Sequence, residues 1–313
     1  MLRKLGAAAL ALGAVGAAGF WVLTTPQQLQ AADLPDHQPD IVNGERIFHA
    51  GGCSSCHAAP GSKGEDKLKL AGGLELATPF GTFRSPNISP DETTGIGGWS
   101  ALDLVNAMQR GTSPDGRHYY PAFPYTSYAR MKTEDIIDLK AYLDTLPAVS
   151  NEVGPHLLGF PFNVRRGLGL WKTLYLDPAP VASLPADVTE AARRGQYLVE
   201  GPGHCGECHT PRNPIGGPDK ANWLAGAANP EGKGSIPNIT PHQEGIASWT
   251  AEDIVNALET GFKPDYDSFG GSMVAVQENM AALPAEDRAA IAAYLKAVPA
   301  HPSTAPKNAE GGS

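Results

Sequence analysis

The chain has 313 residues, of which 42% are hydrophobic and 18% are charged, and its formal net charge is −9. This composition is typical of a folded protein with a core, and the acidic balance argues against nucleic acid or an anionic membrane surface as the main partner. Glycine and proline, at 36 and 28 residues, indicate that much of the backbone lies in loops.

Residues 1–25 are predicted to form a membrane anchor. Two basic residues precede an uncharged stretch from Leu5 to Thr25, which is long enough to cross a bilayer at about 20 residues per span. A cleaved signal peptide is the alternative, although the following residues offer only Ala31 and Ala32 for a small-residue cleavage site. We therefore expect an uncleaved helix in the inner membrane, with a cytoplasmic N-terminus and the rest of the chain in the periplasm.

An internal repeat organises the remainder of the chain. Distinctive residues return at an offset of about 150 residues, as expected of a duplicated unit: Cys53 as Cys205, Trp99 as Trp249, and Tyr142 as Tyr294. The repeat, together with the glycine- and proline-rich segments around it, predicts a linker at 26–40, a first domain at 41–150, a connector at 151–189, a second domain at 190–300 and a disordered tail at 301–313.

Each domain shows the same helix signals. Ser100 and Thr250 stand as N-caps before amphipathic segments, which end at Gly111 and Gly261. A second segment with apolar residues at helical spacing closes each domain, and no segment shows the sustained alternation of a strand. Each domain is therefore predicted to be small and mostly α, with long loops that have little core of their own to pack on.

The four cysteines occupy two copies of one pentapeptide pattern, CSSCH at Cys53–His57 and CGECH at Cys205–His209. Disulfides would not require the histidine, a zinc site would require further ligands within each repeat, and a thioredoxin-like site would require a βαβ setting. Covalent haem explains both cysteines and the histidine of the pattern. The cysteines form thioethers with the vinyl groups, and the histidine ligates the iron. Two motifs in register predict two haem c groups, which would also supply the missing core.

The predicted attachment residues are Cys53, Cys56, Cys205 and Cys208, and the predicted proximal ligands are His57 and His209. In each histidine, the ring nitrogen that does not face the iron is expected to donate a hydrogen bond to a nearby backbone carbonyl, which fixes the tautomer.

A sixth ligand decides whether a haem only carries electrons or also binds a substrate. For the second haem we predict Met273, in the loop after the Trp249 helix. For the first haem we predict Met131, with His118, another ligand or an open position as alternatives. Met108 and Met280 lie in helical segments and are expected to pack in the core.

The motifs GGCSSCHAAPG, SPNISPD, SPDGRHYYPAFPYTSYARM, EGPGHCGECHTPRN, IPNIT and GGSM carry a resemblance over nearly the whole chain. The chain resembles the membrane-anchored dihaem and multihaem c-type cytochrome subunits of periplasmic alcohol, gluconate and sugar dehydrogenases and of nicotinate-type molybdenum hydroxylases. We therefore expect a mostly α fold, with two tandem cytochrome c-like haem domains after an N-terminal transmembrane helix. In the alcohol dehydrogenase branch, a methionine often stands at the position of Phe123 in PAFPY.

The resemblance implies electron transfer from the catalytic subunit of a periplasmic dehydrogenase to a quinone or a terminal oxidase of the respiratory chain. No residue is predicted to act as a catalytic acid or base. The connector aromatics Phe160, Phe162 and Trp171 are expected between the two domains, either at a haem–haem interface or as plain inter-domain core. The alternative function is a dihaem enzyme, a peroxidase or a thiosulfate-oxidising cytochrome, because the missing methionine at Phe123 leaves room for an open sixth position.

Overall fold

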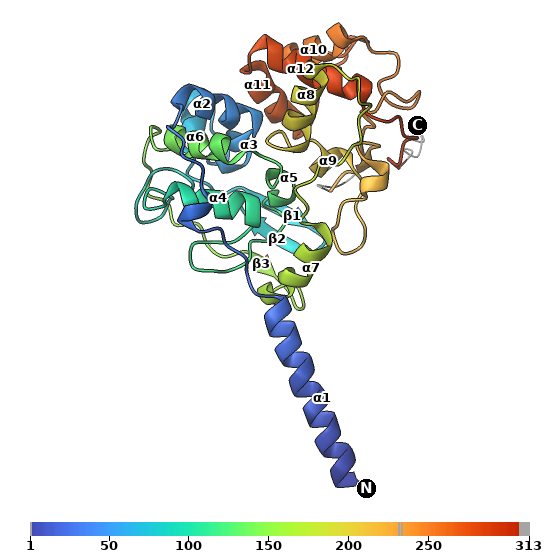
Figure 1. The fold of residues 1–313 in the computed structure, drawn as a ribbon. Helices are drawn as coiled ribbons and strands as arrows, with labels where there is room; N and C mark the ends of the chain where they lie inside the picture. Colours follow the sequence, from blue (N-terminus) through green and yellow to red (C-terminus); the bar gives the residue numbers. More distant parts are fainter. Residues whose placement is uncertain (1, 231, 233, 307–313) are drawn as a thin grey trace.

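The computed structural model describes residues 2–230, 232 and 234–306. Figure 1 shows one long helix, α1, that projects from a body containing both halves of the repeat. Helix α1 spans Leu2–Leu23, and its segment Arg3–Leu23 is long and apolar enough to cross a membrane, with no part of that window buried. This exposed apolar helix agrees with the predicted N-terminal anchor.

The body is mostly helical, and its two halves have corresponding elements. The first half contains α2 (Ile41–Ala50), α3 (Cys53–His57), β1 (Glu75–Thr78), β2 (Gly81–Arg84), α4 (Ala101–Arg110), α5 (Tyr125–Tyr128) and α6 (Thr133–Leu143). The connector contains β3 (Leu157–Leu158) and α7 (Leu168–Tyr175). The second half contains α8 (Glu190–Glu200), α9 (Gly206–His209), β4 (Ala227–Ala228), β5 (Ser235–Ile236), α10 (Ala251–Thr260), α11 (Met273–Ala281) and α12 (Ala285–Ala297).

The predicted caps of α4 and α10 are confirmed. The side chains of Ser100 and Thr250 accept hydrogen bonds from backbone amides in the first turns, at 3.2 and 3.0 Å. Gly111 and Gly261 end the two helices with φ angles of 57° and 80°, a left-handed conformation that glycine adopts without strain.

In each half the first and last helices cross at a glycine. A Cβ atom on Gly44 of α2 would lie 2.1 Å from the carbonyl oxygen of Asp138 in α6. A Cβ atom on Gly195 of α8 would lie 1.9 Å from the carbonyl oxygen of Ala290 in α12. Only glycine permits such a close backbone approach, so the repeat seen in the sequence is matched by the same helix crossing in both halves.

Short strands are present that the sequence did not predict. Strands β1, β2 and β3 form an antiparallel sheet in which Gly81 of β2 pairs with Leu158 of β3, and β4 pairs with β5. These strands have two to four residues each, too few to show an alternating pattern. Because β3 belongs to the connector, the connector is joined to the first half by backbone hydrogen bonds.

The two halves share a polar interface around two buried aspartates. Asp287 of α12 forms ion pairs with Arg46 of α2 and, at 3.0 Å, with Arg194 of α8. Asp135 of α6 accepts hydrogen bonds from Asn43 in its own half and from Tyr197 in the other half. The two aspartates occupy equivalent positions in α6 and α12, and each one joins both halves.

The predicted disordered tail is wrong for residues 301–306, which are held against the second half. The backbone amide of His301 donates to Thr240 Oγ1 at 3.1 Å, and its carbonyl oxygen accepts from Asn238 Nδ2 at 2.7 Å. Further along, the backbone amide of Thr304 donates to the carbonyl oxygen of Ala225 at 2.9 Å. Residues 307–313 of the predicted tail lie outside the described residues.

Candidate functional site

Both CxxCH motifs are helical turns that end at their histidines, α3 and α9. His57 Nδ1 lies 2.9 Å from the carbonyl oxygen of Pro86, and His209 Nδ1 lies 2.8 Å from the carbonyl oxygen of Pro237. Because a carbonyl oxygen only accepts, each Nδ1 carries the proton and each Nε2 is the nitrogen that can bind a metal. Burial lowers the pKa of both histidines, which favours the neutral imidazole that metals require. The predicted carbonyl contacts are confirmed.

The cysteines of the two motifs have matching environments. Cys53 and Cys205 are half-buried, whereas Cys56 and Cys208 are exposed. Burial, with a smaller contribution from the second cysteine of each motif, raises the pKa of Cys53 and of Cys205 to about 12. Each motif therefore presents two thiols and one neutral imidazole from a single helical turn. This donor set fits covalent attachment of haem c through two thioethers with histidine ligation.

Three buried side chains next to the second motif are linked by hydrogen bonds. They were not predicted from the sequence. Trp223 Nε1 donates to the hydroxyl oxygen of Tyr294 at 3.0 Å, and that hydroxyl donates to Glu200 Oε1 at 2.7 Å. The Trp223 ring lies where a side chain at Gly206 would be, since a Cβ atom there would be 2.0 Å from the ring. Gly206, which follows the first cysteine of the second motif, was the signal in the sequence that a large side chain packs against the backbone there.

The predicted sixth ligands lie in two different hydrophobic clusters. Met131 is only 4% exposed and belongs to the cluster of the first half, against which Cys53 packs. Met273 begins α11 and is partly buried against the cluster of the second half, against which Cys205 packs. The fold thus places each methionine in the same half as the expected motif. Met108 and Met280 are buried in the core, as predicted.

The alternatives for the first haem have different surroundings. His118 is buried, and its Nε2 lies 2.9 Å from the carbonyl oxygen of Thr24 at the end of α1, while its Nδ1 has no partner among the described residues. Phe123 packs between the rings of Tyr119 and Tyr128, at centroid distances of 5.6 and 5.5 Å. The described contacts therefore direct His118 towards α1 and place Phe123 in an aromatic cluster of the first half.

The loops that precede the two motifs touch each other. His204 Nε2 lies 3.3 Å from the carbonyl oxygen of Gly51, and the His204 ring contacts the ring of Tyr128 at a centroid distance of 5.7 Å. A methyl group on Gly51 would lie 3.6 Å from Cys53 Sγ and 3.7 Å from the carbonyl oxygen of Pro202. The two expected haem-attachment segments are therefore neighbours in space, although they are far apart in sequence.

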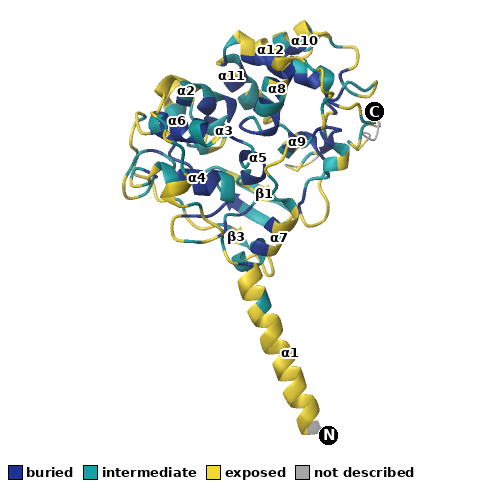
Figure 2. Cartoon of the chain, viewed as in Figure 1, coloured by how far each residue is buried: buried dark blue, intermediate teal, exposed yellow. Residues whose placement is uncertain are grey.

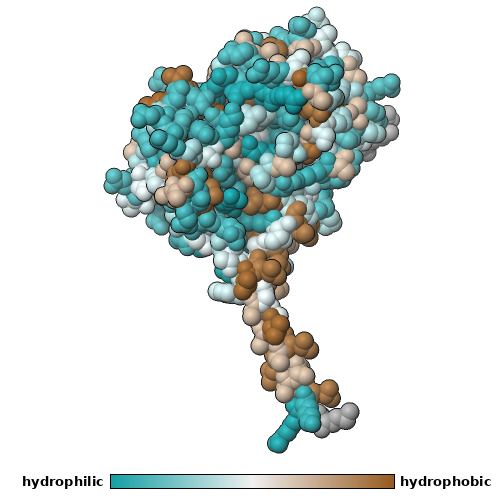
Figure 3. Space-filling view, viewed as in Figure 1, coloured by the Kyte–Doolittle hydropathy of each residue, from teal (hydrophilic) through white to brown (hydrophobic). Residues whose placement is uncertain are grey.

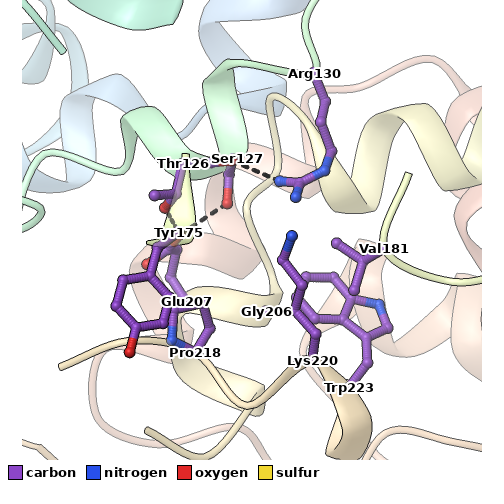
Figure 4. Close-up of a pocket in the computed structure, with 10 residues that line it drawn as sticks. All are labelled: Thr126, Ser127, Arg130, Tyr175, Val181, Gly206, Glu207, Pro218, Lys220 and Trp223. Carbon is purple, nitrogen blue, oxygen red and sulfur yellow. Dashed lines mark hydrogen bonds between the residues drawn. The ribbon is translucent and has the colours of Figure 1, made fainter. Parts of the chain in front are cut away.

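Glu207, between the cysteines of the second motif, is bound by α5 of the first half. Thr126 Oγ1 and Ser127 Oγ donate to Glu207 Oε1 at 3.0 and 2.8 Å, and Arg212 forms an ion pair with the same carboxylate. Burial opposes ionisation of Glu207, but Arg212 and the Ser127 hydroxyl outweigh it and lower the pKa. Figure 4 shows Thr126, Ser127 and Glu207 at a small pocket that Arg130, Lys220 and Trp223 also line.

The chain is similar in sequence to known c-type cytochromes, which agrees with the haem attachment inferred from the two motifs. A cytochrome c family model matches residues 41–147. A "Diheme cytochrome c-type" protein of Cereibacter sphaeroides is 54% identical over 96% of this chain and 99% of its own length.

Two further relatives are much longer than this chain. A nicotinate dehydrogenase subunit of Pseudomonas putida is 37% identical over 86% of this chain and 22% of its own length. The "Fructose dehydrogenase cytochrome subunit" of Gluconobacter japonicus is 36% identical over 84% of this chain and 54% of its own length. Taken together with the paired motifs, these likenesses show that the chain belongs to the dihaem c-type cytochromes and carries two covalently bound haem c groups.

Proposed function

We propose that this cytochrome accepts electrons from the catalytic subunit of a periplasmic dehydrogenase and passes them to the respiratory chain, through a quinone or a terminal oxidase. The observation that carries the proposal is the contact between the two motif-bearing loops at Gly51 and His204, together with the relatives that are named as dehydrogenase subunits. Each haem supplies a one-electron redox couple at its iron. The chain holds the two attachment segments next to each other, as electron passage through one protein requires.

We further propose that residues 41–150 and 190–300 are tandem cytochrome c units, one haem to each. Cys53 and Cys56 would hold the first haem and Cys205 and Cys208 the second, with His57 and His209 as proximal ligands. The matching histidine–carbonyl contacts support this assignment. Helix α1 would anchor the protein in the inner membrane, with its N-terminus in the cytoplasm and both units in the periplasm.

The test of the proposed function is co-purification of the full-length chain from detergent-solubilised membranes. We expect a dehydrogenase polypeptide in the purified complex, and reduction of the c-type α band when that enzyme's substrate is added. A variant that lacks one pair of haem-binding cysteines is the control for the spectral signal. Purification of the chain alone, with haems that no dehydrogenase substrate reduces in solubilised membranes, would contradict the proposal.

The sixth ligands give a separate prediction. If Met131 and Met273 ligate iron, replacing either with leucine should remove the thioether ligand of one haem. The reduction potential of that haem should fall, because sulfur ligation raises it. The same haem should become high-spin, because its sixth position is then open. Redox titration and absorption spectra of the two single variants should report different haems. Met108→Leu is the matched control, since Met108 is buried in the same cluster as Met131.

Unchanged spectra and potentials in Met131→Leu would end the Met131 assignment and move it to His118. A first haem that already binds carbon monoxide in the unaltered protein would favour the dihaem enzyme instead, because Phe123 would then face an open position. A peroxide titration that produces high-valent iron at one haem distinguishes that enzyme from a pure carrier.

A further inference from the structure

Large apolar side chains are exposed together in the connector. Phe160 and Leu174 are 83% and 67% exposed, and Leu157, Phe162, Val164 and Leu170 are each more than 40% exposed. The sequence-based expectation that Phe160 and Phe162 lie between the domains is therefore wrong. Figure 2 colours parts of the chain around α7 as exposed, and the space-filling view in Figure 3 shows hydrophobic residues at the base of the body, where α1 leaves it. We call these six residues the foot surface.

The foot surface is part of the folded body. Leu157 is paired with Thr82 in the sheet, and the Phe162 ring packs on Phe80 with centroids 5.0 Å apart. Trp171 of α7 donates from Nε1 to the carbonyl oxygen of Ile215 at 2.9 Å, which ties the segment to the second half. Ordered apolar side chains that remain exposed in this way mark an interaction site.

The foot surface is joined directly to the end of α1. Arg166 donates from Nη2 to the carbonyl oxygen of Trp21 at 2.6 Å, and its guanidinium lies 4.1 Å from the centre of the Trp21 ring. Thr24 is fully buried in the body, with its Cα 2.5 Å from where a Cβ on Gly169 would be. The end of the apolar helix therefore packs directly against the segment that leads into α7.

The length of α1 fixes the height of the body above a membrane. Its 22 residues span about 33 Å at a rise of about 1.5 Å per residue, close to the roughly 30 Å of a bilayer's hydrocarbon core. If α1 crosses the bilayer, the whole helix is used in crossing. The residues packed on its end, Arg166 and Gly169, then lie at the level of the lipid headgroups.

The charge of the connector suits that position. From Val153 to Leu176 the chain has no aspartate or glutamate, although the net charge of the whole protein is −9. Arg165 and Arg166 lie in this stretch, between the exposed Val164 and Leu170. Basic residues beside exposed apolar side chains are typical of segments that lie in a membrane interface.

We propose that the foot surface inserts into the outer headgroup and acyl boundary of the phospholipid bilayer that α1 spans, so that the body rests on the membrane at two attachments. The proposal rests on the membrane anchoring proposed above. The occupant is lipid and not a protein, because Arg166 and Gly169, which lie in the chain between Val164 and Leu170 of this surface, pack on the end of the helix that would span the bilayer.

The test uses photo-crosslinking in the full-length holoprotein. The photoreactive residue p-benzoylphenylalanine replaces Phe160 or Leu174, and the protein is reconstituted in vesicles of phosphatidylethanolamine and phosphatidylglycerol. After irradiation we expect intact mass spectra to show the gain of one phospholipid mass at both positions. Tyr266, which is 91% exposed in a loop of the second half, is the matched control and should gain none.

A probe at Leu12 of α1 separates the two proposals. Lipid adducts at Leu12 without adducts at Phe160 and Leu174 would overturn the foot surface and leave the anchor intact. No lipid adducts at any of the three positions would overturn both. The same probes in native membranes give a further check, because polypeptide adducts at Phe160 and Leu174 in place of lipid would mean that a protein covers this surface, which also overturns the proposal.

Discussion

Replacing both Cys53 and Cys56 with alanine is expected to leave one covalently bound haem per chain where the unaltered protein has two. Each haem c is retained by its own pair of thioethers, and the cysteines of the second motif lie in the other half of the body. Haem content per chain, from the pyridine haemochrome spectrum and from the mass of the denatured protein, measures the result. The double variant of Cys205 and Cys208 should lose the other haem and give the same mass.

Ser55→Ala is the matched control, because Ser55 lies between the same cysteines and should not affect attachment. Its hydroxyl donates to the carbonyl oxygen of Ala275 at 3.3 Å and accepts from Asn279 Nδ2 at 3.0 Å, so its replacement removes two hydrogen bonds with α11. Two covalent haems in the Cys53 and Cys56 double variant, or none, would show that this motif does not hold one haem independently.

Asp287→Asn is expected to give the largest loss of stability among single substitutions at the interface of the two halves. The Asp287 side chain is 1% exposed and is paired with Arg46 and Arg194, whose side chains are 29% and 30% exposed. Removing the charge of one buried partner leaves the other uncompensated. We expect the free energy of unfolding to fall by about 2–4 kcal/mol, because the partial exposure of the two arginines moderates the loss. Denaturant titration of the holoprotein measures it.

The same carboxylate predicts a pH dependence. Burial opposes ionisation of Asp287, but hydrogen bonds from Arg46 and Arg194 outweigh it, so the pKa lies below its ordinary value of 3.8. A depressed pKa contributes stability that is present above the unfolded-state value and is lost as the pH falls through the folded-state value. The difference in stability between the unaltered protein and Asp287→Asn should therefore shrink on acidification.

An exposed aspartate gives the control for this experiment. Asp267 pairs with Lys263 in a surface loop, and its side chain is 67% exposed. Asp267→Asn should leave the unfolding curve unchanged, because exposed ion pairs contribute little. An Asp287→Asn protein that is as stable as Asp267→Asn at neutral pH would show that the interface does not depend on this charge.

The sequence predicted the features that are encoded locally or by repetition. The caps at Ser100 and Thr250 depend on a side chain three residues from its partner. The need of each motif histidine for a carbonyl partner was predicted from its role as a ligand, although the partners, Pro86 and Pro237, lie in a second segment that is repeated along with the motif. The exposed apolar helix at the N-terminus required only hydropathy and length. In each case the determining residues are neighbours in sequence, or are duplicated at a constant offset.

Contacts between distant segments could not be predicted in the same way. Nothing near Glu207 in the sequence indicates that Thr126 and Ser127 of the other half bind it. Similarly, β3 forms because a two-residue stretch of the connector meets β2 in space. The apolar residues of the connector resembled core in the sequence, and only the fold shows that Phe160 faces outwards.

The contact between the two motif loops has a consequence for biogenesis. In the closed fold, Cys53 and Cys205 have pKa values of about 12 and lie beside the packed loops at Gly51 and Pro202. A thiol in that state is almost fully protonated at neutral pH and is a poor nucleophile. We therefore expect the thioether bonds to form on an open chain, before the two motif loops pack against each other. In that order attachment precedes docking, and a chain that docked first would have to open again before it could receive haem.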